Sequence, residues 1–171
     1  MTRPEKIKTV IKALAGHLNI KFVRSEQSGD RPAYPLMSYK ILSNSPEPAQ
    51  CIIDEFKPVE DDDTKMLKTS TRESDMVISL SFIGGEKDYA NLWSFAEEAH
   101  DWIDSLDGVE TADEIGIGIS VESPVQDRTV YLETEYEHKL GFDFRVRDKK
   151  SKEETVDAVD LAATIVGITY N

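Results

Sequence analysis

The fold is decided by two stretches, Ser70-Thr-Arg-Glu-Ser-Asp-Met-Val-Ile-Ser-Leu-Ser-Phe-Ile83 and Val125-Gln-Asp-Arg-Thr-Val-Tyr-Leu-Glu-Thr-Glu-Tyr-Glu-His-Lys-Leu-Gly-Phe-Asp-Phe-Arg-Val-Arg147. From residue 75 to 83 of the first stretch, large apolar side chains alternate with smaller or polar ones. The second stretch alternates over residues 130–136 and again over 140–146, which predicts two long strands or one strand bent at Gly141. This pattern is typical of an antiparallel sheet with one buried face.

Apolar residues at helical spacing predict two helices that cover this sheet. The first spans about residues 4–18, and Thr2 with Glu5 fits a capping box at its start. The second spans about residues 88–106 and is expected to stop at Asp107-Gly108. We therefore predict an α+β fold: a mainly antiparallel sheet with an N-terminal helix and a second helix packed on one face.

Shorter patterns add further strands to this sheet. Residues 20–23, 36–42 and 115–121 each have the alternation or β-branched character of a strand. The polar run at residues 149–154 predicts an interruption of the strand pattern. The segment 155–171 is ambiguous between strand and helix, but its β-branched residues favour a strand or extended arm. We expect one domain over residues 1–171.

Residues 43–74 form an unusually long excursion for a domain of this size. Three prolines and the acidic run Glu60-Asp-Asp-Asp63 interrupt it, and only residues 50–56 and 65–70 look like strands. These two patches predict a protruding β-hairpin with an acidic tip, an arm for a neighbouring subunit. A mobile surface loop is the alternative, and ordering so polar a segment requires contacts outside the core.

The charge balance excludes several kinds of partner. The chain has 33 acidic and 20 basic residues, with a net charge of -13, so it repels phosphate backbones and anionic lipid. We expect no sequence-specific nucleic-acid binding and no membrane association, since no signal or spanning segment is present. The single cysteine, Cys51, is expected to pack as a small apolar residue in a protein made for a reducing cytoplasm.

The acidic, glycine and histidine residues that could bind an ion or a phosphate do not have the spacing that such sites require. The run Glu60–Asp63 lacks the alternating carboxylates and the glycine of a calcium loop. Neither Gly116-Ile-Gly118 nor Gly84-Gly85 completes a phosphate-binding loop. No metal-ligand spacing relates the three histidines, His17, His100 and His138. We predict no catalytic, cofactor-binding or metal-binding residues and no enzymatic activity.

Several segments, taken in order, resemble the neck or tail-terminator proteins of tailed phages: Tyr34-Pro-Leu-Met-Ser-Tyr-Lys-Ile41, Ser74-Asp-Met-Val-Ile-Ser-Leu-Ser-Phe-Ile83, the helix from Trp93 to Trp102, Val125-Gln-Asp-Arg128 and Tyr136-Glu-His-Lys-Leu-Gly-Phe-Asp-Phe-Arg145. The resemblance covers most of residues 34–147. It implies an α+β structural protein of the virion, assembled in the host bacterial cytoplasm as a homo-oligomeric ring of six subunits. The implied partners are the tail tube protein, head-tail connector or neck proteins, and the sheath protein.

In such a ring, residues 43–74 and the C-terminal segment become candidate arms between subunits. An acidic lumen would let the genome pass without sticking, and two acidic sets are candidates for lining it: Glu97, Glu98, Asp101 and Asp104, or the Glu60–Asp63 tip. The alternative interpretation is an acidic cytoplasmic binding or inhibitor protein, similar to an immunity protein that mimics nucleic acid.

Overall fold

A computed structural model describes residues 1–26, 32–44, 52–60, 62–132 and 135–158, and the chain divides into two structural units. The helix–sheet unit comprises residues 1–45 and 75–148, and the ribbon unit comprises residues 46–74 and 149–171. Two long strands, β4 (Asp62–Gly84) and β8 (Glu135–Asp157), contribute residues to both units. The expectation of one domain over residues 1–171 stays a prediction.

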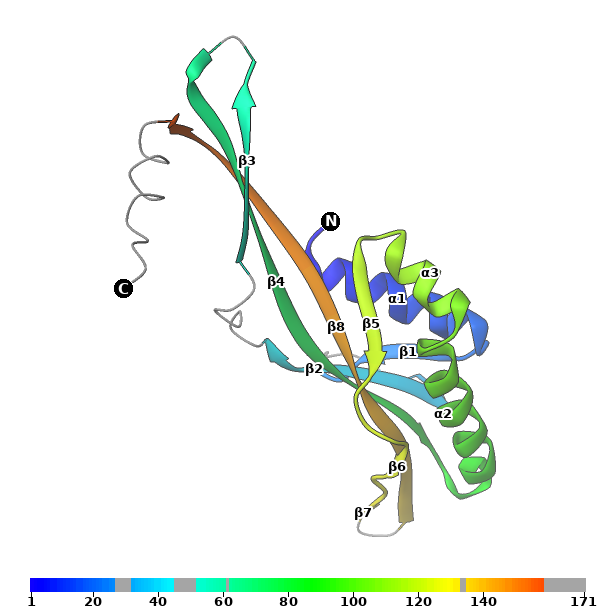
Figure 1. Ribbon diagram of the computed structural model, residues 1–171. Helices are drawn as coiled ribbons and strands as arrows, with labels where there is room; N and C mark the ends of the chain where they lie inside the picture. The colour runs from blue at the N-terminus through cyan, green and yellow to red at the C-terminus, as the bar shows by residue number, and fades with distance from the viewer. Residues whose placement is uncertain (27–31, 45–51, 61, 133–134, 159–171) are drawn as a thin grey trace, which may run out of the picture. The chain divides into compact units, whose positions relative to one another are not determined.

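Helices and short strands complete the helix–sheet unit (Figure 1). The described helical elements are α1 (Arg3–His17), the 3-10 helix η1 (Glu86–Asp88), α2 (Tyr89–Ile103) and α3 (Leu106–Asp113). The remaining strands are β1 (Lys21–Arg24), β2 (Leu36–Asn44), β5 (Ile117–Val121), β6 (Gln126–Asp127) and β7 (Val130–Leu132). The sheet order is β1-β2-β4-β8-β5. The β1 strand runs parallel to β2, whereas β2 pairs antiparallel with β4 and β5 pairs antiparallel with β8.

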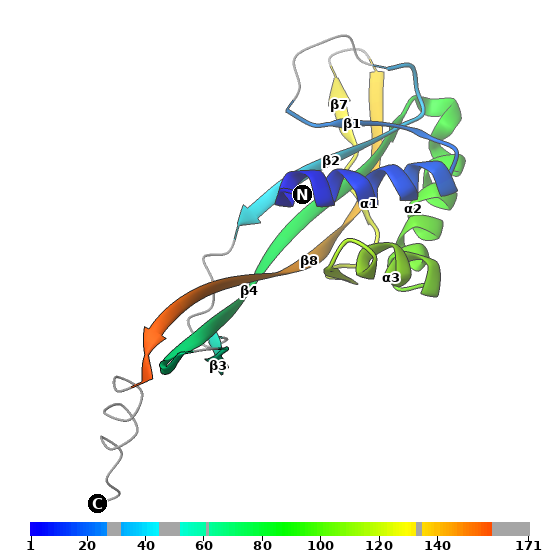
Figure 2. The same cartoon turned by 90° about the horizontal axis from the view of Figure 1, so that it is seen from above.

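The core lies between one face of this sheet and the helices (Figure 2). The alternation predicted for β4 and β8 is confirmed, because these strands bury Met76, Ile78, Leu80, Phe82, Leu140, Phe142, Phe144 and Val146. The apolar stripe of α1 packs against them, and Ile7, Val10, Ile11 and Leu14 are all buried. Leu92, Ala96 and Ala99 of α2 belong to the same cluster. The predicted α+β class, with helices on one face of a sheet, is therefore confirmed.

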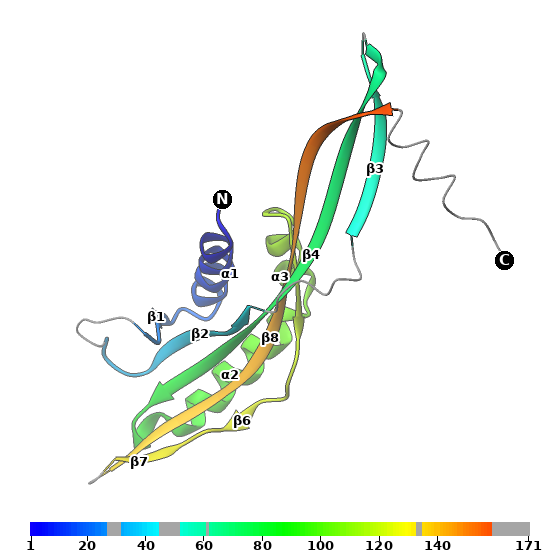
Figure 3. The same ribbon diagram turned by 90° about the vertical axis from the view of Figure 1, so that its left-hand side faces the viewer.

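Two predicted breaks in the strands are wrong. The β4 strand is continuous from Asp62, so the stretch directly before residue 75 is not irregular (Figure 3). At Gly141 the single-strand alternative holds, because β8 passes through this residue without ending there. Tyr136 also belongs to β8, where it pairs with Tyr131 of β7. Residues 149–154 lie inside β8. These stretches show no apolar alternation because they do not contribute a side chain to the core.

The predicted helix stop at Asp107-Gly108 is also wrong, because a third helix, α3, begins at Leu106. The Ser105 hydroxyl caps it by accepting a hydrogen bond from the Gly108 amide at 3.2 Å. Gly108 is needed there, since a Cβ at this position would lie 2.1 Å from the Trp102 carbonyl oxygen. Of the C-terminal segment, residues 155–157 belong to β8, whereas residues 159–171 and Cys51 lie outside the described residues.

Candidate contact surfaces

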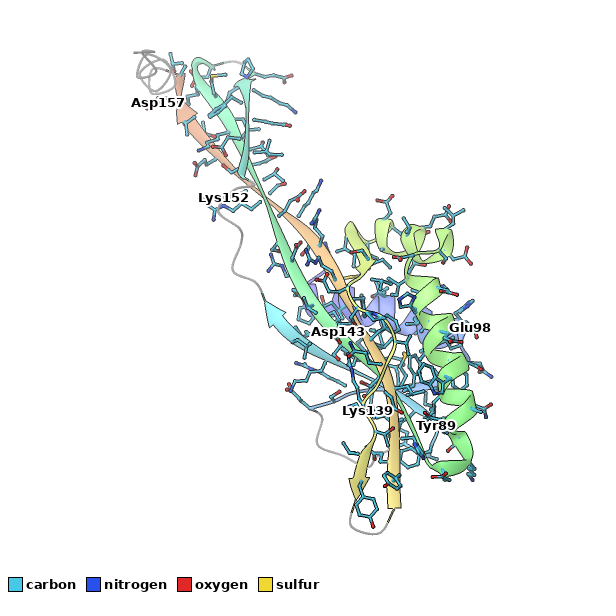
Figure 4. All side chains as sticks on the ribbon, turned by 60° about the horizontal axis from the view of Figure 1, so that its bottom comes forward. Tyr89, Glu98, Lys139, Asp143, Lys152 and Asp157 are labelled. Atoms are coloured by element: carbon cyan, nitrogen blue, oxygen red, sulfur yellow. The ribbon has the colours of Figure 1, made fainter. Side chains whose placement is uncertain are left out.

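The ribbon unit contains a β-hairpin, as predicted for part of residues 43–74. The β3 strand (Ile52–Val59) pairs antiparallel with β4, and the register places Phe56 opposite Lys68. The Lys68 Nζ lies 3.2 Å from an Asp54 carboxylate oxygen and 5.9 Å from the centre of the Phe56 ring. On the other side of β4, the Thr71 and Ser151 hydroxyls are 3.0 Å apart. The hairpin is thus extended to a three-stranded ribbon by the end of β8, where Figure 4 labels Lys152 and Asp157.

The ribbon has no core of its own. No described side chain of residues 53–60, 62–73 or 151–158 is buried. Ile53 is 59% exposed and Phe56 is 37% exposed, although both are large apolar residues. A ribbon without a buried face gains little apolar burial to offset the conformational entropy lost on ordering. These apolar side chains are therefore available to another protein surface.

A second surface is a ladder of aromatic rings at the β7–β8 hairpin of the helix–sheet unit. The exposed rings of Tyr131 and Tyr136 are 4.9 Å apart as a cross-strand pair. The ladder continues to His138 on β8, whose ring centroid lies 4.7 Å from that of Tyr89 at the start of α2. Figure 4 labels Tyr89 on the helix. Rigid, exposed tyrosines are common anchors in protein interfaces.

Carboxylates hold the base of this ladder. Glu86 lies 2.9 Å from His138 Nε2, and the Tyr89 hydroxyl donates to Asp127 Oδ2 at 3.1 Å. Hydrogen bonds from Thr129 are the main cause that lowers the pKa of Asp127, against a desolvation effect that raises it. These contacts hold Tyr89 and His138, the two rings at the base of the ladder.

The sheet face opposite the helices carries a network of paired arginines. Arg128 donates to Ser79 at 2.7 Å and to Asp143 at 3.0 Å, linking β4 with β8. Figure 4 labels Asp143 and, in the same strand, Lys139. Arg145 forms a bidentate pair with Glu122 at 2.7 and 2.9 Å and also reaches Asp75 at 3.3 Å. Since these two guanidinium groups are engaged by carboxylates, they are not free to bind a phosphate backbone.

A buried carboxylate fastens the N-terminal helix to the sheet. Asp148 of β8 is 3% exposed, and its oxygens lie 2.7 Å from Lys6 Nζ and 3.2 Å from Arg3 Nε. Lys6 is therefore engaged by a carboxylate that is remote in sequence. Lys8 and Lys12 of the same helix are exposed.

The first acidic set named as a candidate for the ring lumen lies on the outer surface of α2 and at its C-terminal end. Glu97, Glu98, Asp101 and Asp104 are all exposed. Several of them line a hollow of about 500 Å³ together with His17, Ser94, Trp102, Ser105 and Asp107. Glu98, labelled in Figure 4, lies 3.2 Å from His17 Nε2. The helix therefore has an acidic outer surface, but whether it faces a lumen stays a prediction.

The histidines and the acidic hairpin tip do not converge on one site. His17 pairs with Glu98, His138 pairs with Glu86, and His100 contacts the Phe142 ring edge-on. At the tip, Asp62 accepts the Thr64 amide at 3.0 Å, and hydrogen bonds from the Thr64 hydroxyl are the first cause that lowers its pKa. Within the described parts of the chain, no group of three or more His, Cys, Asp or Glu is arranged to hold a metal ion.

The family model described as phage neck terminator protein matches residues 8–170, almost the whole chain. The chain belongs to the phage neck terminator family. The predicted resemblance is thereby confirmed, and it extends beyond residues 34–147 into both ends of the chain. No curated protein matches the sequence.

Family membership assigns this neck terminator to the tail or neck of the virion as a structural protein that associates with other tail and neck proteins. That assignment favours the structural role over the alternative of an acidic inhibitor. The family suggests a protein without enzymatic activity, and the absence of catalysis stays a prediction. Among the described helices, none has the length and apolar character needed to cross a bilayer.

Proposed function

We propose that this neck terminator forms a closed ring at the head-proximal end of the tail, terminates the tail tube there and joins it to the neck. The family match supports this role, and the observation that carries the proposal is the ribbon unit without a core. A strand ribbon with no buried apolar side chain among its described residues is suited to packing on a neighbouring subunit. The β3–β4 hairpin and the end of β8 are then arms between subunits.

Strand edges offer a way for such arms to pair. Among the described strands, β3 pairs only with β4, so one of its edges has unpaired backbone groups. Adding a strand at this edge would supply main-chain hydrogen bonds, while Ile53 and Phe56 would supply apolar contact area. A contact between two different patches of the same chain is heterologous, and it closes into a ring when the rotation between subunits permits.

The resemblance to tail terminators supports a ring of six subunits, built in the host bacterial cytoplasm before or during tail assembly. On this proposal one side of the ring contacts the tail tube protein, and a sheath protein where the tail has one. The other side contacts the head-tail connector or other neck proteins. None of these contacts requires a cofactor or a catalytic residue.

The acidic surface of α2 is the candidate for the lumen. Glu97, Glu98, Asp101 and Asp104 are exposed, and the chain has a net charge of -13. A carboxylate-lined channel repels the DNA phosphates, so the genome passes without binding. A map of the assembled ring with basic residues around its channel would overturn this part of the proposal.

The test is to add the purified protein to tail tubes of its own phage and to image the tubes by negative stain. The proposal predicts a disc at one end of each tube. Replacing Ile53 and Phe56 by serine should abolish the disc, because both side chains belong to the exposed ribbon. The matched control replaces Leu106 and Val109, which are 71% and 47% exposed on α3, and should leave the disc intact. Tubes that stay bare with the wild-type protein would contradict the proposal.

A further inference from the structure

The helix–sheet unit has a groove between α1 and β1 that its own side chains do not fill. Two hollows, of about 450 and 430 Å³, share Glu5 and Lys8 in their linings. Lys12 lines the first, and Arg24 lines the second over a floor that includes Phe22 and Tyr39. The rings of Phe22 and Tyr39 have centroids 6.5 Å apart. The groove therefore has an aromatic floor and basic walls.

The basic walls are not neutralised within the described chain. Lys8, Lys12 and Arg24 have no carboxylate within ion-pair distance among the described residues, whereas Arg3, Lys6 and Arg145 are all paired. The one acid in the groove, Glu5, is already bound, since the Thr2 amide donates to its Oε2 at 2.6 Å. Three cations against one engaged carboxylate give the groove a positive potential on an acidic protein.

A free strand edge borders the same groove. The β1 strand is the last strand of the sheet on its side and pairs with β2 alone among the described strands. Its outer edge presents unpaired backbone amide and carbonyl groups to an incoming chain. An extended or turn segment entering this groove would meet main-chain partners, aromatic surface and cations together. These features select a protein segment rich in carboxylates.

We propose that the groove receives the acidic turn between β3 and β4 of a second copy of this chain. The run Glu60-Asp-Asp-Asp63 is the longest run of consecutive carboxylates in the sequence and extends from this turn into the start of β4. Glu60 is exposed and has no partner among the described residues, while Asp62 is engaged by Thr64 and Lys65 of the same strand. The opposite charges make the contact heterologous, which is the type that closes a ring. The inference rests on the proposed ring and names the surfaces that close it.

Charge reversal on each side tests the contact in the full-length protein. The groove variant is Lys8→Glu/Lys12→Glu, and the turn variant is Glu60→Lys/Asp61→Lys, which leaves Asp62 to hold its local contacts. Loss of two ion pairs should raise the concentration needed for assembly at least about tenfold in each variant. The control Lys87→Glu/Lys139→Glu has the same charge change as the groove variant and involves lysines outside the groove, so it should assemble like the wild type.

Rescue separates a specific contact from general damage. An equimolar mixture of the groove and turn variants should assemble, because each interface then joins either two native surfaces or two reversed ones. A single chain carrying all four substitutions should assemble for the same reason. Thermal melts of every variant check that the helix–sheet unit remains folded.

Each other outcome overturns the inference. A groove variant that assembles like the wild type, or a mixture and a combined variant that stay unassembled while folded, shows that the turn does not occupy the groove. A groove variant that forms normal rings but loses a tail or neck partner assigns the groove to that partner instead. Both results leave the proposed ring intact, whereas a wild-type protein that never oligomerises refutes the ring and this contact together.

Discussion

Replacing Gly141 by alanine is expected to destabilise the protein strongly. Gly141 lies in β8 between the buried residues Leu140 and Phe142. A Cβ at this position would lie 2.1 Å from the Leu80 carbonyl oxygen and 3.0 Å from the Ser81 Cα, both backbone atoms of β4. Since a carbon and an oxygen that are not bonded need about 3.2 Å or more, two central strands would have to separate by roughly 1 Å.

The magnitude follows from where this displacement occurs. Overpacking a well-packed core costs about 1–3 kcal/mol, and we expect the upper end because the obstructing atoms are backbone rather than a flexible side chain. A loss of about 3 kcal/mol corresponds to a fall in Tm of roughly 6–12 °C for a chain of this size. Thermal melts followed by circular dichroism, with urea midpoints as a second measure, would detect a change of this size.

Gly118→Ala is the matched control, since it places the same methyl group on β5 of the same sheet. There the nearest atom to the new Cβ is the Arg147 Cβ at 3.8 Å, an ordinary contact. This substitution should leave the Tm unchanged or raise it slightly, because alanine reduces the entropy of the unfolded chain. Equal effects of the two substitutions would refute the argument that close approach of β4 and β8 requires glycine at 141.

Three further predictions concern the carboxylates and the ribbon. Asp148→Ala should lower the free energy of unfolding by about 2 kcal/mol, because Arg3 and Lys6 lose a buried partner; urea melts check this, and Glu98→Ala, which removes an exposed pair with His17, should have little effect. The lowered pKa of Asp127 stabilises the fold above its ordinary value near pH ~3.9. That contribution is lost as the pH falls through the lowered value, so Asp127→Asn should show a shallower decline of Tm below about pH 4, and parallel curves would contradict this. Amide hydrogen exchange should be fast in β3 of the monomer and slow in the assembled protein, while the β4 amides of residues 76–83 stay protected in both; slow exchange of β3 in the monomer would show that the ribbon needs no partner.

The sheet core could be predicted from the sequence because burial on one face leaves a period of two. Leu80 and Phe82 of β4, and Phe142 and Phe144 of β8, follow that period, so both strands were predicted over their buried parts. The helical stripe of α1 was equally clear. The period of two does not predict the parts of the strands that lie outside the core. Residues 149–154 belong to β8 but bury neither face, so their sequence does not alternate between apolar and polar residues.

The remaining misses depend on contacts between residues far apart in the sequence. Helix α3 was missed because Gly108 looked like a stop, whereas Ser105 caps a new helix there. The ion pairs of Lys6 with Asp148 and of Arg145 with Asp75 join residues that are far apart in the sequence, so no local spacing of residues predicts them. The sequence does not predict the basic groove either, because its walls come from α1 and β1, which meet only in the folded protein.

The most direct test of the central claim is the mass of the purified wild-type protein in solution, measured by light scattering across a range of concentrations. The account predicts a closed assembly of several subunits, formed alone or on addition of the tail tube protein, and this assembly should disappear when Ile53 and Phe56 are replaced by serine. A protein that remains a monomer at every concentration, with and without tube protein, would contradict the ring and leave the ribbon without its proposed partner.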